Sequence, residues 1–330
     1  MTYRDVFRRD IRSVYRSRTG TAVAAIIALT TVVAVGLFTL ASNVALLGAV
    51  GALLTVGALV ALVFIGDPKQ IAGVVVAFTA LAIATALLLR EPTAGYDPRP
   101  PMQVGVLAVG TALSFVVPLV ALLGSYAAVV GERETGSVRF LLGLPNSRDD
   151  AYLGKFLARA AVVCVPLVAA LALTGVVVQL TFQDGSMLGM LGLALVTVPY
   201  ALLFVGIGLT ASAYADSSNR AVAVVITVFA ALRAGWPALQ WLGLQGMRED
   251  YVYPKPEWFF WVGRVNPINA YVKLTTLFAE FEYGHPLLTN PDETISTVAT
   301  TYPFAAAVLL AWTVVAPVFG LLYFRSRDLL

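Results

Sequence analysis

Long stretches of the chain carry only uncharged residues, most of them apolar, and short charged segments separate these stretches. No Asp, Glu, Lys or Arg occurs in residues 21–66, 71–89 or 102–130. Because a helix of about 20 apolar residues crosses the hydrocarbon core of a bilayer, such runs predict membrane-spanning helices. The pattern predicts an all-α integral membrane protein with about eight transmembrane helices. The predicted spans are residues 21–41, 44–66, 71–89, 102–130, 156–181, 187–213, 220–244 and 302–324.

The first two predicted spans are separated only by Ser42 and Asn43. The uncharged run that contains them is about 46 residues long, which exceeds the length of one span and suits two. We therefore expect a tight helical hairpin in residues 21–66, at the start of one membrane domain that extends over residues 21–330.

The N-terminal segment, residues 1–20, places apolar and basic side chains at helical spacing. Its apolar positions are Tyr3, Phe7, Ile11 and either Val14 or Tyr15. Its basic positions are Arg4, Arg8, Arg9, Arg12, Arg16 and Arg18. This pattern is typical of an amphipathic helix that lies in the membrane interface. A solvated basic tail and a cleaved signal peptide are the alternatives.

The distribution of Lys and Arg predicts the orientation, because basic residues favour the cytoplasmic side of a membrane protein. With the N-terminus inside, the inner segments hold the six N-terminal arginines, Lys69, Arg133, Arg139, Arg148, Lys155, Arg220, Arg325 and Arg327. The outer segments hold Arg90, Arg99, Arg248, Lys255, Arg264 and Lys273. We therefore expect both termini and residues 131–155 inside the cell, and residues 245–301 outside.

The cytoplasmic segment, residues 131–155, has the pattern of two helices with a stiff break between them. Residues 132–142 alternate charged and apolar positions at roughly helical spacing, and Pro145 then breaks the chain. Ser147 is a candidate N-cap for the second helix, and Asp150 three residues later completes a variant of the capping box. A simple linker needs no such order, whereas a surface that docks another protein does.

The outer segment, residues 245–301, is rich in acidic and aromatic side chains. Aromatic residues gather at membrane interfaces, so we interpret residues 257–262 as an interfacial or re-entrant piece. After Asn266-Pro267, we expect Ile268–Phe281 to form a short helix packed at the outer surface. An ordered lid without a role in substrate binding is the alternative.

The composition excludes most catalytic and metal-binding sites. Hydrophobic residues make up 59% of the 330 residues and charged residues 12%, against about a quarter charged in soluble domains. The single His285 and the single Cys164 give no metalloprotease motif, disulfide framework or thiol-lined metal path. The net charge of +3 is too small to suggest binding to nucleic acid. Gly154-Lys155 is similar to the end of a phosphate-binding loop, but Phe156 stands where that loop requires Ser or Thr.

Two charged residues, Arg159 and Arg233, fall inside predicted spans. Charged side chains in a membrane are costly and usually face a partner or a water-filled cavity. Arg159 lies about one turn past Lys155, so we expect it to snorkel to the inner interface. Arg233 lies midway along its span without an evident acidic partner, and it is our candidate for a residue of the substrate path or the gate. A tilted or shifted span that lets Arg233 reach the headgroups is the alternative.

Several short motifs occur together in the cytoplasmic segment. A span is followed by Glu132-Arg-Glu-Thr-Gly136-Ser, Phe140-Leu-Leu, Leu144-Pro-Asn-Ser-Arg148 and Leu153-Gly-Lys155, and then by another span. In this combination the chain resembles the permease subunits of type 2 ATP-binding-cassette (ABC) transporters, especially those of nitrous-oxide-reductase maturation and their archaeal relatives. The N-terminal helix, the long outer segment and Asn266-Pro-Ile-Asn269 fit the same layout. Two features differ from that family: eight spans are predicted where six are usual, and the composition does not support copper handling.

The resemblance implies a transport subunit that is not itself an enzyme. It implies that a separate cytosolic ATPase subunit binds ATP and Mg, and that this chain holds no catalytic, cofactor or metal site. It also implies a multi-pass protein of the cell membrane that pairs with a second permease copy, identical or different, and exports a substrate. The residues expected to couple to the ATPase are Glu132, Arg133, Glu134, Gly136, Val138, Arg139, Leu141, Leu142, Pro145, Ser147, Arg148, Gly154 and Lys155.

Different members of this set are expected to act in different ways. The apolar face expected to enter a cleft of the ATPase consists of Val138, Leu141 and Leu142. Glu134 and Arg148 either face the partner or brace the loop through ion pairs, and Gly136 and Gly154 allow a close approach of backbones. A membrane-embedded enzyme or sensor that uses Arg233 and acids of the outer segment, without any ATPase, is the rival hypothesis.

Overall fold

A computed structural model of the chain describes residues 3–16, 27, 31, 102–136, 147–181, 187–246, 255–279 and 297–326. The three spans expected in residues 21–89 lie outside these ranges, apart from two single positions, as does the centre of the cytoplasmic segment, residues 137–146. Every regular element within the described ranges is a helix. The protein is therefore all-α over this part, and the total of eight spans stays a prediction.

Five helical segments of the described residues are long and apolar enough to cross a membrane. They cover Val109–Glu134, Arg148–Val176, Met187–Tyr214, Ser218–Gly246 and Tyr302–Ser326. The helices that form them are α5 (Met102–Ser125), α6 (Val130–Glu134), α8 (Arg148–Thr181), α9 (Met187–Tyr214), α10 (Ser218–Ala230), α11 (Trp236–Gly246) and α14 (Tyr302–Ser326). These bounds lie close to the last five spans predicted from the sequence.

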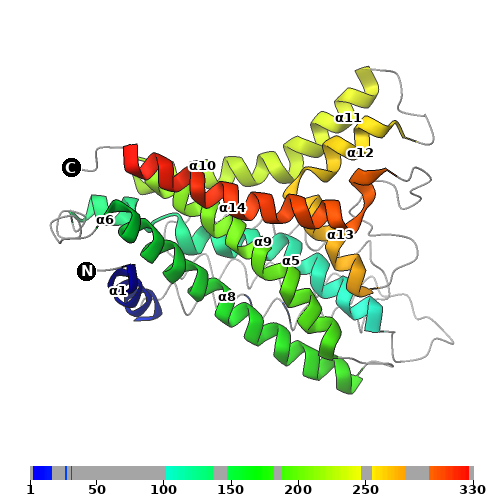
Figure 1. The fold of residues 1–330 in the computed structure, drawn as a ribbon, viewed down its shortest axis with the longest axis horizontal. Helices are drawn as coiled ribbons and strands as arrows, with labels where there is room; N and C mark the ends of the chain where they lie inside the picture. The colour runs from blue at the N-terminus through cyan, green and yellow to red at the C-terminus, as the bar shows by residue number, and fades with distance from the viewer. Residues whose placement is uncertain are drawn as a thin grey trace, which may run out of the picture.

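The long helices lie side by side along the longest axis of the molecule (Figure 1). Helix α1 (Tyr3–Arg16), α6, the start of α8 and the end of α14 gather at one end, where both termini also lie. Helices α11 and α12 (Glu257–Arg264) lie at the opposite end. The segment expected to be cytoplasmic and both termini are thus at the same end of the bundle.

Helix α9 is the centre of the described bundle and packs against α5, α8 and α14. Its sequence is apolar on all sides, which is typical of a helix surrounded by others. Tyr200 and Phe204 of α9 are fully buried, and their rings meet edge to face with centroids 5.1 Å apart. Helix α14, by contrast, leaves Val314 and Phe319 largely exposed, as suits a helix that faces lipid or another membrane protein.

Helix α13 (Pro267–Ala279) contacts α5, α9 and α14 and lies inside the bundle. The ring of Tyr271 stacks on that of Tyr200 with centroids 4.0 Å apart, and its hydroxyl lies 3.1 Å from Oγ1 of Thr197. The predicted helix is thus present, but its predicted place at the outer surface is wrong. Backbone groups of a helix are satisfied internally, which lets such a short helix insert between spans.

Helix α1 confirms the predicted N-terminal helix but turns a different face to the bundle. Val6 and Asp10, one turn apart, are its buried side chains, whereas Tyr3 of the predicted apolar face is exposed. Phe7 and Ile11 of the predicted apolar face are half-buried. The place of this face in the membrane interface stays a prediction.

Helix α6 ends at Glu134, earlier than the helix predicted over residues 132–142. Gly136 follows with a φ of 72°, in the left-handed region, and its N–H donates to the Arg133 carbonyl at 3.1 Å. Glycine is favoured at this position after a helix because it has no Cβ to clash. A break therefore comes at Gly136, and a continuous helix over residues 132–142 is wrong; the break predicted at Pro145 lies outside the described residues. A Cβ at Gly136 would meet nothing within 4 Å, so this glycine serves the turn and does not allow a close approach within the described residues.

Candidate functional site

The candidate site lies where α1, α6 and α8 meet, at the end of the bundle that carries both termini (Figure 1). A group of charges links the three helices there, and Lys155 and Asp10 are its buried members. Nζ of Lys155 lies 2.7 Å from Oε1 of Glu132 and 3.5 Å from Oδ2 of Asp10, and Nη2 of Arg9 lies 3.0 Å from the same Glu132 oxygen. Only 1% of the Lys155 side chain is exposed. Since a buried charge is costly without partners, these contacts fix the helices in one arrangement.

Gly154 is the crossing point of α1 and α8. A Cβ at this position would lie 2.6 Å from Cβ of Val6 and 2.8 Å from the Tyr3 carbonyl oxygen. Both distances are shorter than van der Waals contact, so only glycine allows α1 to lie this close to α8. The expected close approach at Gly154 is present, and its partner in the structure is the chain's own N-terminal helix.

The first turn of α8 confirms the capping prediction. The Ser147 hydroxyl accepts a hydrogen bond from the Asp150 N–H at 3.0 Å and donates to Oδ2 of Asp150 at 2.6 Å. The other Asp150 oxygen accepts from the Tyr3 N–H at 3.2 Å. The cap of α8 therefore also holds the first residue of α1 that the structure describes.

The same turn is tied to the end of α14. Nε of Arg325 donates to Oδ1 of Asp149 at 2.6 Å, and its Nη2 donates to Oδ2, so that the pair is bidentate. Nη1 of Arg148 donates to the Arg325 carbonyl oxygen at 2.8 Å. This contact of Arg148 with a carbonyl braces the start of α8 against the end of α14.

Glu134 ties α6 to the turn that joins α9 to α10. Its two carboxylate oxygens accept hydrogen bonds from the N–H and the hydroxyl of Ser218, at 2.7 Å and 2.6 Å. A carboxylate at the N-terminus of a helix also interacts favourably with the helix dipole. Nη1 of Arg133 donates to the Ala215 carbonyl in the same turn, at 3.1 Å. Of the two roles expected for Glu134, the structure shows the bracing one.

The backbone between α5 and α6 is held by a side chain of α9. The Ser212 hydroxyl accepts hydrogen bonds from the N–H groups of Val129 and Val130 at 2.9 Å and 3.1 Å. Nη1 of Arg159 donates to the nearby Gly124 carbonyl at 3.2 Å. Arg159 therefore has a partner near the end of α5 that leads to α6, and the expectation that it snorkels to the inner interface stays a prediction.

Eight of the residues predicted to couple to an ATPase lie at this end within the described ranges. They are Glu132, Arg133, Glu134, Gly136, Ser147, Arg148, Gly154 and Lys155. Val138, Arg139, Leu141, Leu142 and Pro145 lie outside the described residues. Sequence reasoning missed the side chains that hold this group from other helices, which are Asp10, Ser212, Ser218 and Arg325. Asp10 had a signal, because it is an acidic residue within a strongly basic helix.

Arg233, the candidate for the substrate path, lies in a π-helical turn, Ala231–Gly235, between α10 and α11. Its guanidinium carbon is 3.5 Å from the centroid of the Phe115 ring of α5, which is a cation–π contact. The side chain is half-buried, and both its role in the substrate path and the alternative of a shifted span with Arg233 among headgroups stay predictions. Short π-helical turns within α-helices are frequent at functional sites.

The outer segment holds this π-helical turn. Nδ2 of Asn266 donates to the Leu232 carbonyl at 2.7 Å, while its Oδ1 accepts from the Ile268 N–H at 2.9 Å. Nδ2 of Asn269 donates to the Gly263 carbonyl at 2.9 Å. The motif Asn266-Pro-Ile-Asn269 therefore links the backbone next to Arg233 to α12 and α13.

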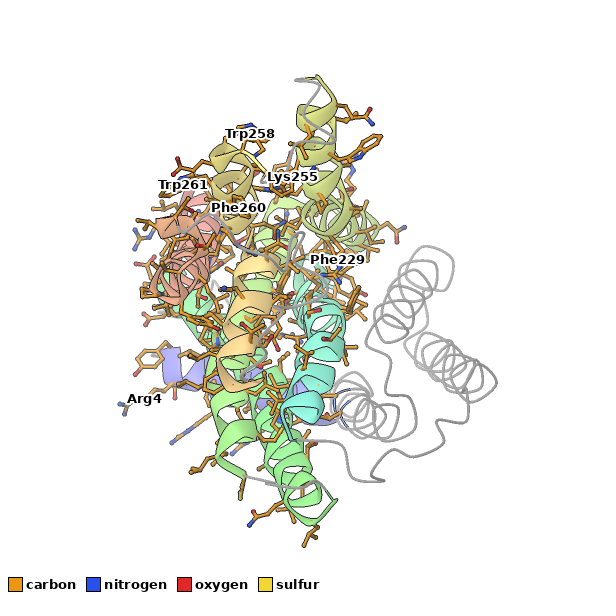
Figure 2. The ribbon with its side chains drawn as sticks, turned by 90° about the vertical axis from the view of Figure 1, so that its right-hand side faces the viewer. Arg4, Phe229, Lys255, Trp258, Phe260 and Trp261 are labelled. Carbon is orange, nitrogen blue, oxygen red and sulfur yellow. The ribbon has the colours of Figure 1, made fainter. Side chains whose placement is uncertain are left out.

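Helix α12 forms an aromatic edge at the opposite end from the charged group. Figure 2 views the bundle from this end and shows Trp258, Phe260 and Trp261 together at one edge. Nε1 of Trp236 donates to the Val262 carbonyl at 2.8 Å, which fastens α12 to α11. Residues 257–262 are thus helical, and their place in the membrane interface stays a prediction.

Comparison with known proteins identifies the family of the chain. Residues 5–329 match the family described as ABC-2 family transporter protein. The chain is 31% identical over 86 residues to a probable ABC transporter permease protein NosY of Stutzerimonas stutzeri, an alignment that covers 26% of this chain and 31% of that protein. It is 38% identical over 60 residues to the protein of the same name in Pseudomonas aeruginosa, covering 18% of this chain and 22% of that protein. The matched segments thus span less than a third of these curated relatives. Because the family match covers nearly the whole chain, this multi-pass membrane protein belongs to the ABC-2 family of ABC transporter permeases.

Proposed function

We propose that this chain is the membrane half of a transporter in which a separate cytosolic ATPase subunit binds ATP and Mg and drives export of a substrate. The observation that carries the proposal is the linkage of helix ends at the charged end of the bundle. There, Lys155, Glu132 and Asp10 join three helices, and Asp149 with Arg325 joins a fourth. A permease that receives movement from outside the membrane needs such a connected surface.

In the mechanism that we propose, the ATPase pushes on the cytoplasmic segment, and the connected spans then move as one unit. The apolar face of Val138, Leu141 and Leu142 would dock in the ATPase, with Arg139 and Pro145 in the same segment. Force at this segment would reach α8 through the cap of its first turn and reach α10 through Glu134, whose carboxylate holds Ser218. Since buried ion pairs and helix caps resist local deformation, little of the movement would be lost in bending the loop.

We also propose that two permease copies work together. Type 2 permeases pair, and the described part of this chain leaves large apolar side chains exposed on α11 and α14, among them Leu239 and Phe319. Helix faces of this kind are covered either by lipid or by another membrane protein. Pairing would place a substrate path between the two copies.

Arg233 is the residue that we propose for the path or the gate. Its half-buried guanidinium over Phe115 lies in a π-helical turn that Asn266 holds from the outer segment. A charged side chain at such a depth usually faces a partner or a watery cavity. Arg233→Leu should alter transport in vesicles while leaving membrane insertion and ATPase binding unchanged. Unchanged transport would remove Arg233 from the path.

The proposed function is tested by co-purification of a tagged permease with an ATPase chain. Leu141→Asp should abolish the association, because a carboxylate cannot enter an apolar cleft without a large desolvation cost. Glu134→Gln should keep the association and lower ATP turnover, because the Glu134 carboxylate holds Ser218 at the start of α10. An ATPase that co-purifies equally with Leu141→Asp, at unchanged activity, would refute the docking assignment. A permease that never recovers an ATPase would favour the rival hypothesis of a membrane enzyme or sensor.

A further inference from the structure

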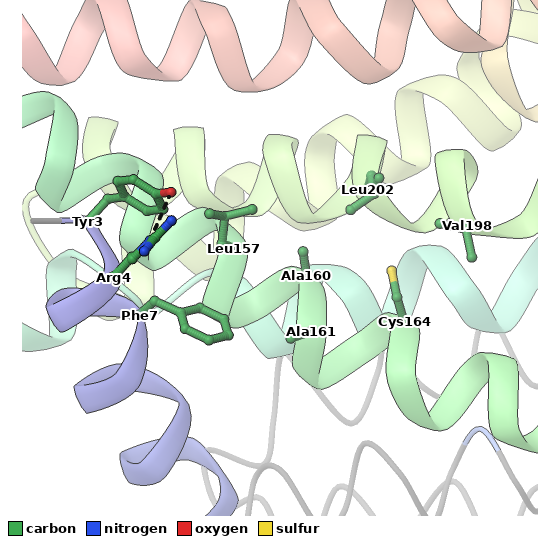
Figure 3. Close-up of a pocket in the computed structure, with 9 residues that line it drawn as sticks. All are labelled: Tyr3, Arg4, Phe7, Leu157, Ala160, Ala161, Cys164, Val198 and Leu202. Carbon is green, nitrogen blue, oxygen red and sulfur yellow. Dashed lines mark hydrogen bonds between the residues drawn. The ribbon is translucent and has the colours of Figure 1, made fainter.

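A groove with a volume of about 500 Å³ lies between α1, α8 and α9 (Figure 3). Leu157, Ala161 and Cys164 line it from α8, Leu202 lines it from α9, and Phe7 lines it from α1. These walls are almost entirely apolar. The small side chain of Ala161 leaves the space that a larger residue would fill.

One charged residue lines this groove, and it lies at one end. Figure 3 shows Arg4 beside Tyr3 and Phe7 at the α1 end, and Cys164 with Val198 at the other. Leu157 and Cys164 are seven residues apart on α8, which corresponds to about 10 Å along the helix. The groove therefore runs from a basic mouth at the charged end of the bundle into the apolar part of a membrane span.

Arg4 is exposed and has donors to spare for an anion. Its Nε donates to the Tyr3 hydroxyl at 3.4 Å, which is a long hydrogen bond. A guanidinium has five N–H donors in a planar fork that matches the oxygens of a phosphate. The side chain thus remains able to hold a phosphate group at the mouth of the groove.

We propose that this groove binds one acyl chain of an anionic phospholipid, with the lipid phosphate at Arg4. A phospholipid matches the groove in its order of charged and apolar parts, because its charged head lies at the interface and its hydrocarbon chain points into the membrane. The bound lipid fills the space between α1 and α8, next to the helix crossing at Gly154. This assignment does not depend on the proposed coupling to an ATPase.

The test uses the full-length permease in vesicles that contain a phosphatidylglycerol with a photoactivatable group on its acyl chain. Peptide mapping should find the label within residues 157–164 and 198–202. Unlabelled phosphatidylglycerol should compete for this labelling, and phosphatidylcholine should not. Arg4→Gln should reduce the labelling about fivefold, the size expected for one basic side chain at an anionic surface. Arg8→Gln is the matched control, since Arg8 is also exposed on α1 but does not line the groove, and it should leave the labelling unchanged.

A second pair of variants tests the binding of the acyl chain in the groove separately from the binding of the phosphate at Arg4. Ala161→Leu should reduce the labelling, because its side chain occupies the space of the acyl chain, whereas Ala169→Leu on an exposed part of α8 should not. Equal losses with Arg4→Gln and Arg8→Gln would show general attraction to anionic lipid and overturn the assignment. Labelling that survives Ala161→Leu would overturn it too. Absence of label together with disulfide-linked dimers through Cys164, the single cysteine of the chain, would show that a second copy covers the groove instead.

Discussion

The charged group between α1, α6 and α8 predicts an unequal response to removal of its two central partners. In Glu132→Gln, the almost fully buried Lys155 keeps only Asp10, at 3.5 Å. Breaking a buried ion pair in this way costs about 3–5 kcal/mol, because it leaves a charge without its closest partner. In Lys155→Met, Glu132 and Asp10 both keep Arg9, at 3.0 Å and 3.6 Å. The cost should then be that of weakened hydrogen bonding, about 1–3 kcal/mol.

The assay is unfolding of the purified permease in mixed micelles, followed by tryptophan fluorescence. Glu132→Gln should be less stable than Lys155→Met, and the double variant should be more stable than Glu132→Gln alone, because it no longer buries an ammonium group with a weakened set of partners. Arg220→Gln is the matched control. This variant breaks the ion pair between Arg220 and Asp216, whose side chains are 71% and 53% exposed, respectively. Its loss of stability should be no more than about 0.5 kcal/mol.

Two results would refute this reasoning. If Lys155→Met is as destabilising as Glu132→Gln, then the charge left on Lys155 without its nearest carboxylate is not what destabilises Glu132→Gln. If all three variants behave like Arg220→Gln, the charged group does not hold the helices together at all.

Three further predictions concern single positions. Gly154→Ala should destabilise the protein by about 1–3 kcal/mol, because the added Cβ has no room beside α1. Faster protease cleavage near Val6 should show that α1 is loosened. Gly131→Ala is the control and should behave as the wild type, because its Cβ would lie 3.8 Å from the nearest neighbour. Gly136→Ala should cost about 1–2 kcal/mol in unfolding experiments because of its left-handed φ, and Gly136→Asn should cost less. Asn266→Ala leaves the Leu232 carbonyl without its amide donor. We expect the stability to fall by about 1–3 kcal/mol and transport to change. Stability equal to that of the wild type would show that the amide does not hold the π-helical turn.

The spans of the described part were predictable because their signal is local. A charge-free run of sufficient length is enough to place α9, and Ser147 with Asp150 is enough to start α8. The hydrogen-bonded turn at the end of α6 was less visible. Gly136 is itself a signal for the end of a helix, but the alternation of charged and apolar residues continues past it to Leu142, and that pattern favoured a longer helix.

The links between helix ends could not be predicted, because they join residues far apart in the chain. Asp10 and Lys155 are separated by 145 residues, and Ser212 and Val129 by 83. The position of α13 inside the bundle could not be predicted either. A 13-residue apolar helix has the same local pattern at a surface as inside a bundle, and the Tyr271–Tyr200 stack appears only when the fold is known.

The central claim is that movement of an ATPase reaches the spans because the helix ends at the charged end of the bundle form one body. The most direct measurement joins α8 to α14 covalently where Asp149 and Arg325 pair. Cysteines at these two positions, in a Cys164→Ser background, would be linked with a short flexible bismaleimide in the reconstituted permease–ATPase complex. Because the two helix ends are expected to move together, the linked complex should retain the ATP turnover of the unlinked one. A loss of turnover on linking, absent when only one of the two cysteines is present, would show that these helix ends move apart during the cycle and would contradict the account.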